Sequence, residues 1–221
     1  MLAKKQSTEK QADKQGRTRG RPKLEDVAAI ESALLDVALA EFAAHGYGGT
    51  SMARIVKAAG ISKTTLYSRF SSKADLFLAL IRLQMRRLSA STALQPTTGK
   101  LDLESGLKAY ANAAIAFSER GVMLEVNRLI YSEAHRFPEL AAAADEAAEL
   151  GICQISDFIQ QCAEADGKAC RDPRSAAEVF IFMLRGWYAH NMLTNRDMTG
   201  ARREQWVDAA VTTLVSSRED W

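Results

Sequence analysis

A short polar stretch, residues 62–69, carries the side chains whose chemistry is most evident in this 221-residue chain. It contains Ser62, Lys63, Thr64, Thr65, Tyr67, Ser68 and Arg69. Hydroxyls, a phenol and cations of this kind contact DNA phosphates and the edges of bases. No acidic residue occurs from Ala58 to Ala74, so the stretch has a local positive field. The alternative, a helical hairpin whose polar face meets only water, favours Glu and Lys pairs that this segment lacks.

Two short helices must position these side chains. Met52, Ile55 and other apolar residues are spaced to bury one face of a helix that runs to about Ala59, with Thr50 or Ser51 as its cap. Gly60 accepts the left-handed conformation that ends such a helix, and Ser62 offers an N-cap oxygen to the next one. The second helix is predicted from Lys63 to about Phe70. The pattern predicts a helix-turn-helix.

Three linked segments in this region resemble the TetR/AcrR family of transcriptional regulators. They read FAAHGYGGTS (42–51), AAGISKTTLYSRF (58–70) and SSKADLF (71–77), and the likeness runs from about Val27 to Leu80. The resemblance implies recognition-helix contacts from residues 63–69, a phosphate contact from Lys73, and Ser51 and Met52 beside the DNA backbone. The expected DNA-binding set is therefore Ser51, Met52, Ser62, Lys63, Thr64, Thr65, Tyr67, Ser68, Arg69 and Lys73, with Arg19 and Arg21 from the segment described next.

Residues 1–23 form a basic arm with almost no large apolar side chains, a composition that predicts disorder. Within it the RGRP sequence, which contains Arg19 and Arg21, resembles an AT-hook, a segment that lies in narrow A/T-rich minor grooves. Glycine permits close approach to the groove floor, and the two guanidinium groups seek its enhanced negative potential. A basic tail that only aids solubility is an equally good interpretation.

The rest of the chain reads as helices. A helix is expected from about Leu24 to His45, where Gly46 stops it, and a capping-box-like Ser72 and Asp75 start a long one toward Leu94. Five further helical segments are expected near residues 102–118, 122–136, 139–165, 173–194 and 202–216. We therefore expect an all-α protein of about nine helices, with a helix-turn-helix domain at 24–72 and a ligand-binding and dimerisation domain at 73–221. Residues 128–140 and 172–193 resemble the AefR-like or AcrR-like C-terminal domain of the same family.

A cavity is expected in this second domain, because members of the family enclose a small molecule between such helices. Its predicted lining is Tyr110, Phe117, Met123, Tyr131, Phe158, Phe182 and Trp187. Polar candidates for orienting a ligand are Glu125, Arg128, Glu133, His135 and His190. For any one of these residues, a place in the plain core or in solvent is an open alternative.

The last two helices are predicted to form a homodimer interface, because their apolar faces exceed what one chain buries. The expected interface residues are Phe180, Met183, Leu184, Trp206, Ala210 and Leu214. Such a dimer would place two recognition helices on successive turns of a palindromic operator.

Composition points away from several other classes of protein. Apolar residues make up 47% of the chain, enough for a core, but no run approaches the roughly 18 apolar residues of a spanning helix, so a cytoplasmic protein is expected. Cys153, Cys162 and Cys170 lack metal-site or disulfide spacing, and a redox role for one of them is a minor alternative. No phosphate loop, GxSxG or HExxH motif is present, so we expect no enzyme, cofactor or metal.

The leading hypothesis is a repressor that binds double-stranded DNA as a homodimer and is released by a small, apolar effector. An architectural DNA-binding protein without an inducer is the alternative. A measured affinity ratio between one palindrome and random DNA separates the two.

Overall fold

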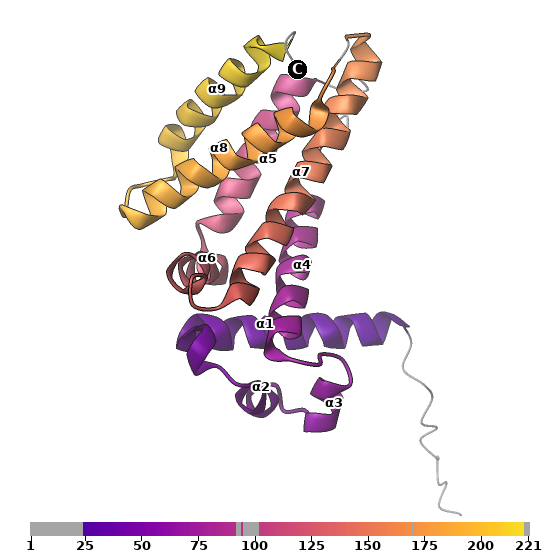
Figure 1. The fold of residues 1–221 in the computed structure, drawn as a ribbon, viewed down its shortest axis with the longest axis vertical. Helices are drawn as coiled ribbons and strands as arrows, with labels where there is room; N and C mark the ends of the chain where they lie inside the picture. Colours follow the sequence, from indigo (N-terminus) through magenta and orange to yellow (C-terminus); the bar gives the residue numbers. More distant parts are fainter. Residues whose placement is uncertain (1–23, 92–93, 95–101, 169, 219–221) are drawn as a thin grey trace, which may run out of the picture.

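A computed structural model describes residues 24–91, 94, 102–168 and 170–218 of the chain. In these residues it contains nine α-helices and no strand: α1 (Leu24–Gly49), α2 (Met52–Ala59), α3 (Lys63–Tyr67), α4 (Lys73–Ser91), α5 (Leu103–Ser118), α6 (Gly121–Glu133), α7 (Pro138–Asp166), α8 (Pro173–Leu193) and α9 (Gly200–Ser216). Figure 1 shows α1, α2 and α3 at one end of an elongated molecule and α8 and α9 toward the other, with α4 and α7 running between them. The expectation of an all-α fold is confirmed.

Local signals in the sequence set the ends of α2 and α3. The Ser51 side chain accepts a hydrogen bond from the Arg54 amide at 3.2 Å, and Gly60 ends α2 in the left-handed region, at φ 64°. The Ser62 side chain then accepts from the Thr65 amide at 3.0 Å. The second helix ends at Tyr67, before the predicted Phe70, and in the turn that follows the amides of Arg69 and Phe70 both donate to the Leu66 carbonyl oxygen, at 3.1 and 2.9 Å.

Gly46 breaks α1, as its position in the sequence predicts. Its backbone leaves the helical region, at φ 71° and ψ 169°, and the chain turns so that the next residue points inward. The ring of Tyr47 then stacks on Phe42, with centroids 5.6 Å apart, and meets Phe77 of α4 edge-on. This aromatic cluster joins the end of α1 to the start of α4.

The helix α4 belongs to both ends of the molecule. Its first turns bury Leu76, Phe77 and Leu80 in the same hydrophobic cluster as the apolar residues of α1, α2 and α3. That cluster also takes in Val126 and Leu129 of α6, together with the start of α7. We call α1–α3 the head and α5–α9 the body. The two share buried contacts through α4 and the start of α7.

The body has a second core, formed mainly by α5, α7, α8 and α9. Its entry into α8 follows the predicted signal, since the Asp172 carboxylate accepts from the Ser175 amide at 2.9 Å and Pro173 opens the helix. The Phe158 ring packs directly on Gly106 of α5, where an added Cβ would lie 2.2 Å from a ring carbon. The body is therefore closely packed along the α5 and α7 contact.

Candidate functional site: a recognition helix and a body cavity

The outward face of α3 presents the side chains predicted to meet DNA. Leu66 is fully buried beneath the helix, and Phe70 anchors the turn after it. Lys63, Thr64 and Ser68 are exposed, and Tyr67 keeps 52% of its surface free. The structure therefore brings an ammonium, hydroxyls and a phenol together on one exposed surface, which we call the recognition face.

Some of the predicted DNA-binding residues are occupied in holding the fold. The Ser51 and Ser62 hydroxyls cap α2 and α3, and the Thr65 hydroxyl lies 2.8 Å from that of Ser62. Met52 is the first residue of α2, and its side chain is buried in the head core, so only its backbone is left for the predicted place beside DNA. These side chains order the starts of α2 and α3.

The cations of the head divide into paired and free groups. The Lys73 ammonium donates to the carbonyl oxygens of Tyr47 at 2.7 Å and Thr50 at 3.1 Å, and its predicted phosphate contact stays a prediction. Arg69 pairs with Glu31 at 3.3 Å. Lys63, by contrast, is exposed and has no acidic partner in the part of the chain that the structure describes. The arm that contains Arg19 and Arg21 lies outside the described residues.

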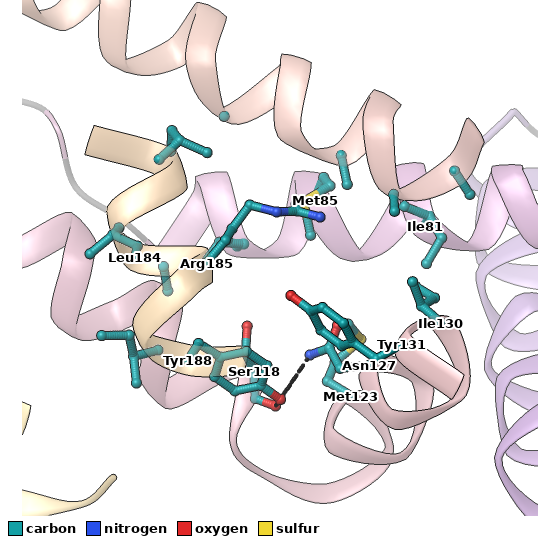
Figure 2. A pocket seen from close by; sticks show the side chains of 18 of the residues that line it. Ile81, Met85, Ser118, Met123, Asn127, Ile130, Tyr131, Leu184, Arg185 and Tyr188 are labelled. Carbon is teal, nitrogen blue, oxygen red and sulfur yellow. Dashed lines mark hydrogen bonds between the residues drawn. The ribbon is translucent and has the colours of Figure 1, made fainter. Parts of the chain in front are cut away.

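A cavity of about 120 Å³ lies in the body, where five helices meet. It is lined by Ile81, Met85, Leu88, Tyr110, Ala114, Ile115, Ser118, Met123, Asn127, Ile130, Tyr131, Ala143, Ala144, Ala147, Gly151, Ile181, Leu184, Arg185 and Tyr188. Figure 2 shows Arg185 reaching from α8 toward Met85 of α4, while Tyr131 projects from α6. Most of the lining is apolar, and the few polar groups lie on α5, α6 and α8.

One hydrogen-bonded group fixes the wall between α5, α6 and α8. The Tyr188 hydroxyl donates to the Ser118 carbonyl oxygen at 2.8 Å and accepts from the Asn127 side-chain amide at 3.1 Å (Figure 2). Burial raises the pKa of Tyr188 to about 12, so its phenol stays protonated at neutral pH. These three residues form a fixed polar rim on the cavity.

Three of the seven residues predicted to line a cavity do so: Tyr110, Met123 and Tyr131. The other four do not line this cavity. Phe158 fills the core against Gly106, Phe182 is half exposed on the outer side of α8, and the Trp187 ring stacks on Trp206 with centroids 4.7 Å apart. Phe117 is half-buried and is not part of the lining. Apolar character alone did not separate the core from the cavity.

The sequence interpretation missed the only charged residue of the lining, Arg185. A signal for it exists, because Arg185 is the single charged residue between Glu178 and His190 in an otherwise apolar stretch of helix. Of the polar candidates proposed instead, Glu125 and Arg128 pair with each other at 2.9 Å on the surface of α6. His190 is exposed near the end of α8.

The residues predicted for the dimer interface differ in burial. Phe180, Leu184 and Leu214 are buried in the core of their own chain, so they are not available to a second copy. Met183, Trp206 and Ala210 are half-buried. The exposed large residues of α8 are Val179 at 51%, Phe182 at 50% and Leu193 at 70%. Both sides of α8 are apolar, and the sequence did not show which side the chain itself covers.

The cysteines and acids form no further site in the described segments. No group of three or more His, Cys, Asp or Glu side chains there could hold a metal ion. Cys162 is buried, which raises its thiol pKa, and Cys153 is exposed beside Glu149. None of the described helices is both long and apolar enough to cross a membrane.

Comparison with known proteins agrees with this arrangement. Residues 34–80 match the tetR family of bacterial regulatory proteins, and residues 105–217 match the C-terminal domain of AefR-like transcriptional repressors. The chain is 39% identical over 100 residues to the HTH-type transcriptional repressor ComR of Escherichia coli K12, which is 45% of each protein. It is 32% identical over 131 residues, 58% of each protein, to the transcriptional activator FasR of Mycolicibacterium smegmatis. These matches span about half the length of either relative.

Solved structures cover more of the chain. A TetR-family transcriptional regulator from Mesorhizobium loti is 28% identical, with a TM-score of 0.67 over 86% of this chain and 96% of its own. The flavonoid-responsive regulator FrrA is 27% identical, with a TM-score of 0.67 over 86% and 97%. The predicted class, a transcriptional regulator and not an enzyme, is confirmed by these relatives. The chain therefore belongs to the TetR family of bacterial regulatory proteins, with a C-terminal domain of the AefR-like repressor type.

Proposed function

We propose that the protein is a repressor that binds a palindromic DNA operator as a homodimer and leaves it when a small molecule enters the body cavity. The observation that carries this proposal is the recognition face, where Lys63, Thr64 and Tyr67 are exposed on a helix whose position is fixed by the buried Leu66. Such a helix places side chains in a major groove while its ends meet phosphates. Binding to bacterial DNA places the protein in the cytoplasm.

The outer side of α8 supports a dimer. Val179 and Phe182 are half exposed, and Gly186, one turn further on, leaves open space where a Cβ would lie. A glycine within a helix costs about 1 kcal/mol relative to alanine, and no atom of the described residues lies within 4 Å of where its Cβ would be. A second copy of α8 that packs against this side accounts for both observations, with α9 completing a four-helix interface. Two recognition helices then lie roughly 34 to 36 Å apart, as in other helix-turn-helix dimers.

The helix α4 supplies a route from the cavity to the head. Ile81, Met85 and Leu88 line the cavity, while Leu76 and Phe77, on the same helix, belong to the head core. Ion pairs hold it on both sides, Arg82 with Glu146 of α7 and Arg87 with Asp36 of α1. A ligand that favours one position of α4 therefore changes the spacing of the two heads, and the dimer shifts toward a state that no longer fits the operator.

The test is a fluorescence-anisotropy titration of the intact protein against the DNA upstream of its own gene and against a random duplex of equal length and composition. We expect the upstream DNA to bind at least about 1000-fold more tightly, the lower end of the range for specific recognition. Equal affinity for both duplexes would overturn the proposal of a specific operator and support the architectural alternative.

One observation favours keeping activation as a second outcome. FasR, among the similar proteins, is an activator, and ComR is a repressor. A reporter fused to the bound DNA distinguishes the two, because expression falls in the presence of a repressor and rises in the presence of an activator.

A further inference from the structure

The lining of the body cavity carries charge of one sign only, which is positive. Its lining contains no Asp or Glu, and Arg185 is its only charged residue. The side chain is half-buried and, in Figure 2, reaches from α8 toward the thioether of Met85. Removing a guanidinium from water next to apolar groups is costly unless a partner of opposite charge or hydrogen-bond acceptors compensate.

The protein does not supply that partner in the segments that the structure describes. No acidic side chain there pairs with Arg185, and no hydrogen bond of its guanidinium occurs among those residues. Arg174, the other arginine of α8, behaves differently, since it pairs with Glu149 of α7 at 2.8 Å. The Arg185 guanidinium, which has five N–H donors, therefore lies at the cavity with no hydrogen-bond partner among the described residues.

The neighbouring polar groups differ from Arg185 in their hydrogen bonding. The Tyr110 phenol faces the region of Gly151, where an added Cβ would lie 3.1 Å from its oxygen. Burial raises the pKa of Tyr110 to about 12, although the positive charge of Arg185 lowers it, so the phenol keeps its proton at neutral pH. The Ser118 carbonyl oxygen, an acceptor on the opposite wall, is already occupied by Tyr188. The hydroxyls of Tyr110 and Tyr131 and the Asn127 amide can donate or accept, whereas the Arg185 guanidinium only donates and carries the charge.

We propose that the cavity binds a small organic acid whose carboxylate accepts hydrogen bonds from Arg185 and whose apolar part lies among Ile81, Met85 and Ile130. The guanidinium fork matches a carboxylate in two parallel hydrogen bonds. The cavity volume of about 120 Å³ is of the order of the ~150 Å³ that holds a benzene ring, so the acid is compact. This inference rests on the proposed function of the cavity as the effector site, and it adds a carboxylate to the small, apolar effector expected from the sequence.

The test compares acids with neutral molecules of the same shape. Benzoate, cinnamate and octanoate are titrated into the full-length dimer without DNA by isothermal calorimetry, each beside its primary amide. We expect at least one acid to bind 10-fold or more tightly than its amide. If no acid of the three binds better than its amide, the proposal is wrong, whether the amides bind or nothing does.

Variants then assign the charge to Arg185. Arg185→Met keeps much of the length and apolar bulk of the side chain. We expect it to lower the affinity for the best acid by about 10- to 100-fold, because a hydrogen bond to a charged group is lost. The affinity for the amide should change little. Arg185→Lys keeps a cation but not the forked guanidinium, and its affinity for the acid should lie between those of the wild-type protein and Arg185→Met. Arg174→Met is the control, because that arginine lies on the same helix and is paired outside the cavity. Equal loss in the Arg174 and Arg185 methionine variants would overturn the assignment.

Acid binding and DNA binding are separate readouts. Addition of the best acid to the complex with the upstream DNA should lower the DNA affinity. Acid binding without any change in DNA affinity keeps the Arg185 site but contradicts the proposed function, whereas specific DNA binding with no preference for acids keeps the proposed function and contradicts the Arg185 site.

Discussion

The recognition face and the body cavity are built in different ways. The recognition face comes from one continuous stretch, residues 51–70, in which Ser51, Gly60 and Ser62 set the helix ends and Leu66 fixes which side is outside. The cavity takes side chains from α4, α5, α6, α7 and α8. The first is encoded by neighbours in the sequence, and the second is the space that distant helices leave unfilled. A DNA-binding surface is therefore easier to identify from sequence than an effector site.

The two regions also differ in how their charges are satisfied. Around the recognition face, Arg54 and Arg69 are neutralised by Glu41 and Glu31, and Lys63 remains free in solvent, where an unpaired cation costs little. In the cavity the unpaired cation is half-buried Arg185. This difference agrees with our proposals that the head binds DNA, a polyanion, and that the body binds a single anion.

The largest loss of operator affinity should come from a change that leaves both the recognition face and the body cavity intact. Val179→Asp combined with Phe182→Asp puts two charges on the outer side of α8, where a second copy would bury them without partners. We expect a monomer by sedimentation velocity and a loss of operator affinity of at least about 100-fold, because a single head makes half the contacts.

A matched control for this change is Leu150→Asp, at an exposed apolar residue of α7 that lies outside α8 and α9. It should remain dimeric. If the double variant is still a dimer, the interface must lie on another surface. Leu214→Asp, at a buried position, tests folding and not assembly.

The next effect sharpens the role of the recognition face. If Lys63 reads a base edge, Lys63→Ala should cost about 1 to 3 kcal/mol of operator binding and relax the preference at one position of each half-site. Lys57→Ala, which removes an exposed cation of α2, is the comparison, and a phosphate contact there would lower the affinity for all sequences alike. A Lys63 variant that loses as much affinity for random DNA as for the operator argues against base reading.

Substitutions at two glycines compare the cost of crowding the packed body with the cost of straining the turn before the recognition helix. Gly106→Ala should destabilise the protein by about 1 to 3 kcal/mol, because the buried Phe158 ring must move from the new methyl group. Gly60→Ala meets no neighbouring atom, so its cost comes from the left-handed backbone alone and should be about 1 to 2 kcal/mol. Urea unfolding of both variants measures the two values. A neutral Gly106 variant would show that the body repacks more freely than its structure indicates.

The smallest effect is expected at the phenol of the recognition face. Tyr67→Phe removes one hydroxyl from a residue that is 52% exposed, and the loss should be about 0.5 to 1.5 kcal/mol if that hydroxyl donates to a phosphate. Because phosphate contacts carry no base information, the loss should be similar on every operator variant. A loss confined to one base position would instead assign Tyr67 to base reading.

The sequence predicted the helices of this protein closely and its buried chemistry poorly. The predicted segments 102–118 and 173–194 differ from α5 and α8 by a single residue at one end, because caps such as Asp172 and the apolar spacing are local signals. The faces of α8 were not predictable in the same way. Phe180 and Phe182 are equally apolar, and only the packing of α5, α7 and α9 decides that the first is buried and the second exposed.

Lys73 shows the same limit in the head. Its charge and place at the start of α4 predict a phosphate contact, but they do not reveal that the carbonyl oxygens of Tyr47 and Thr50 accept hydrogen bonds from its ammonium. Arg185 is the reverse case, a residue that attracts no notice in a helical pattern and becomes prominent when five helices enclose it.

The most direct test of the central claim, that α3 reads a symmetric DNA site, is selection of duplexes from a random-sequence pool by the intact protein and by Lys63→Ala. Our account predicts that the wild-type protein enriches an inverted repeat with half-site centres about 10 base pairs, or a multiple of one helical turn, apart. It also predicts that Lys63→Ala enriches the same repeat with one position in each half relaxed. Enrichment of no sequence, or of one without two-fold symmetry, would contradict it.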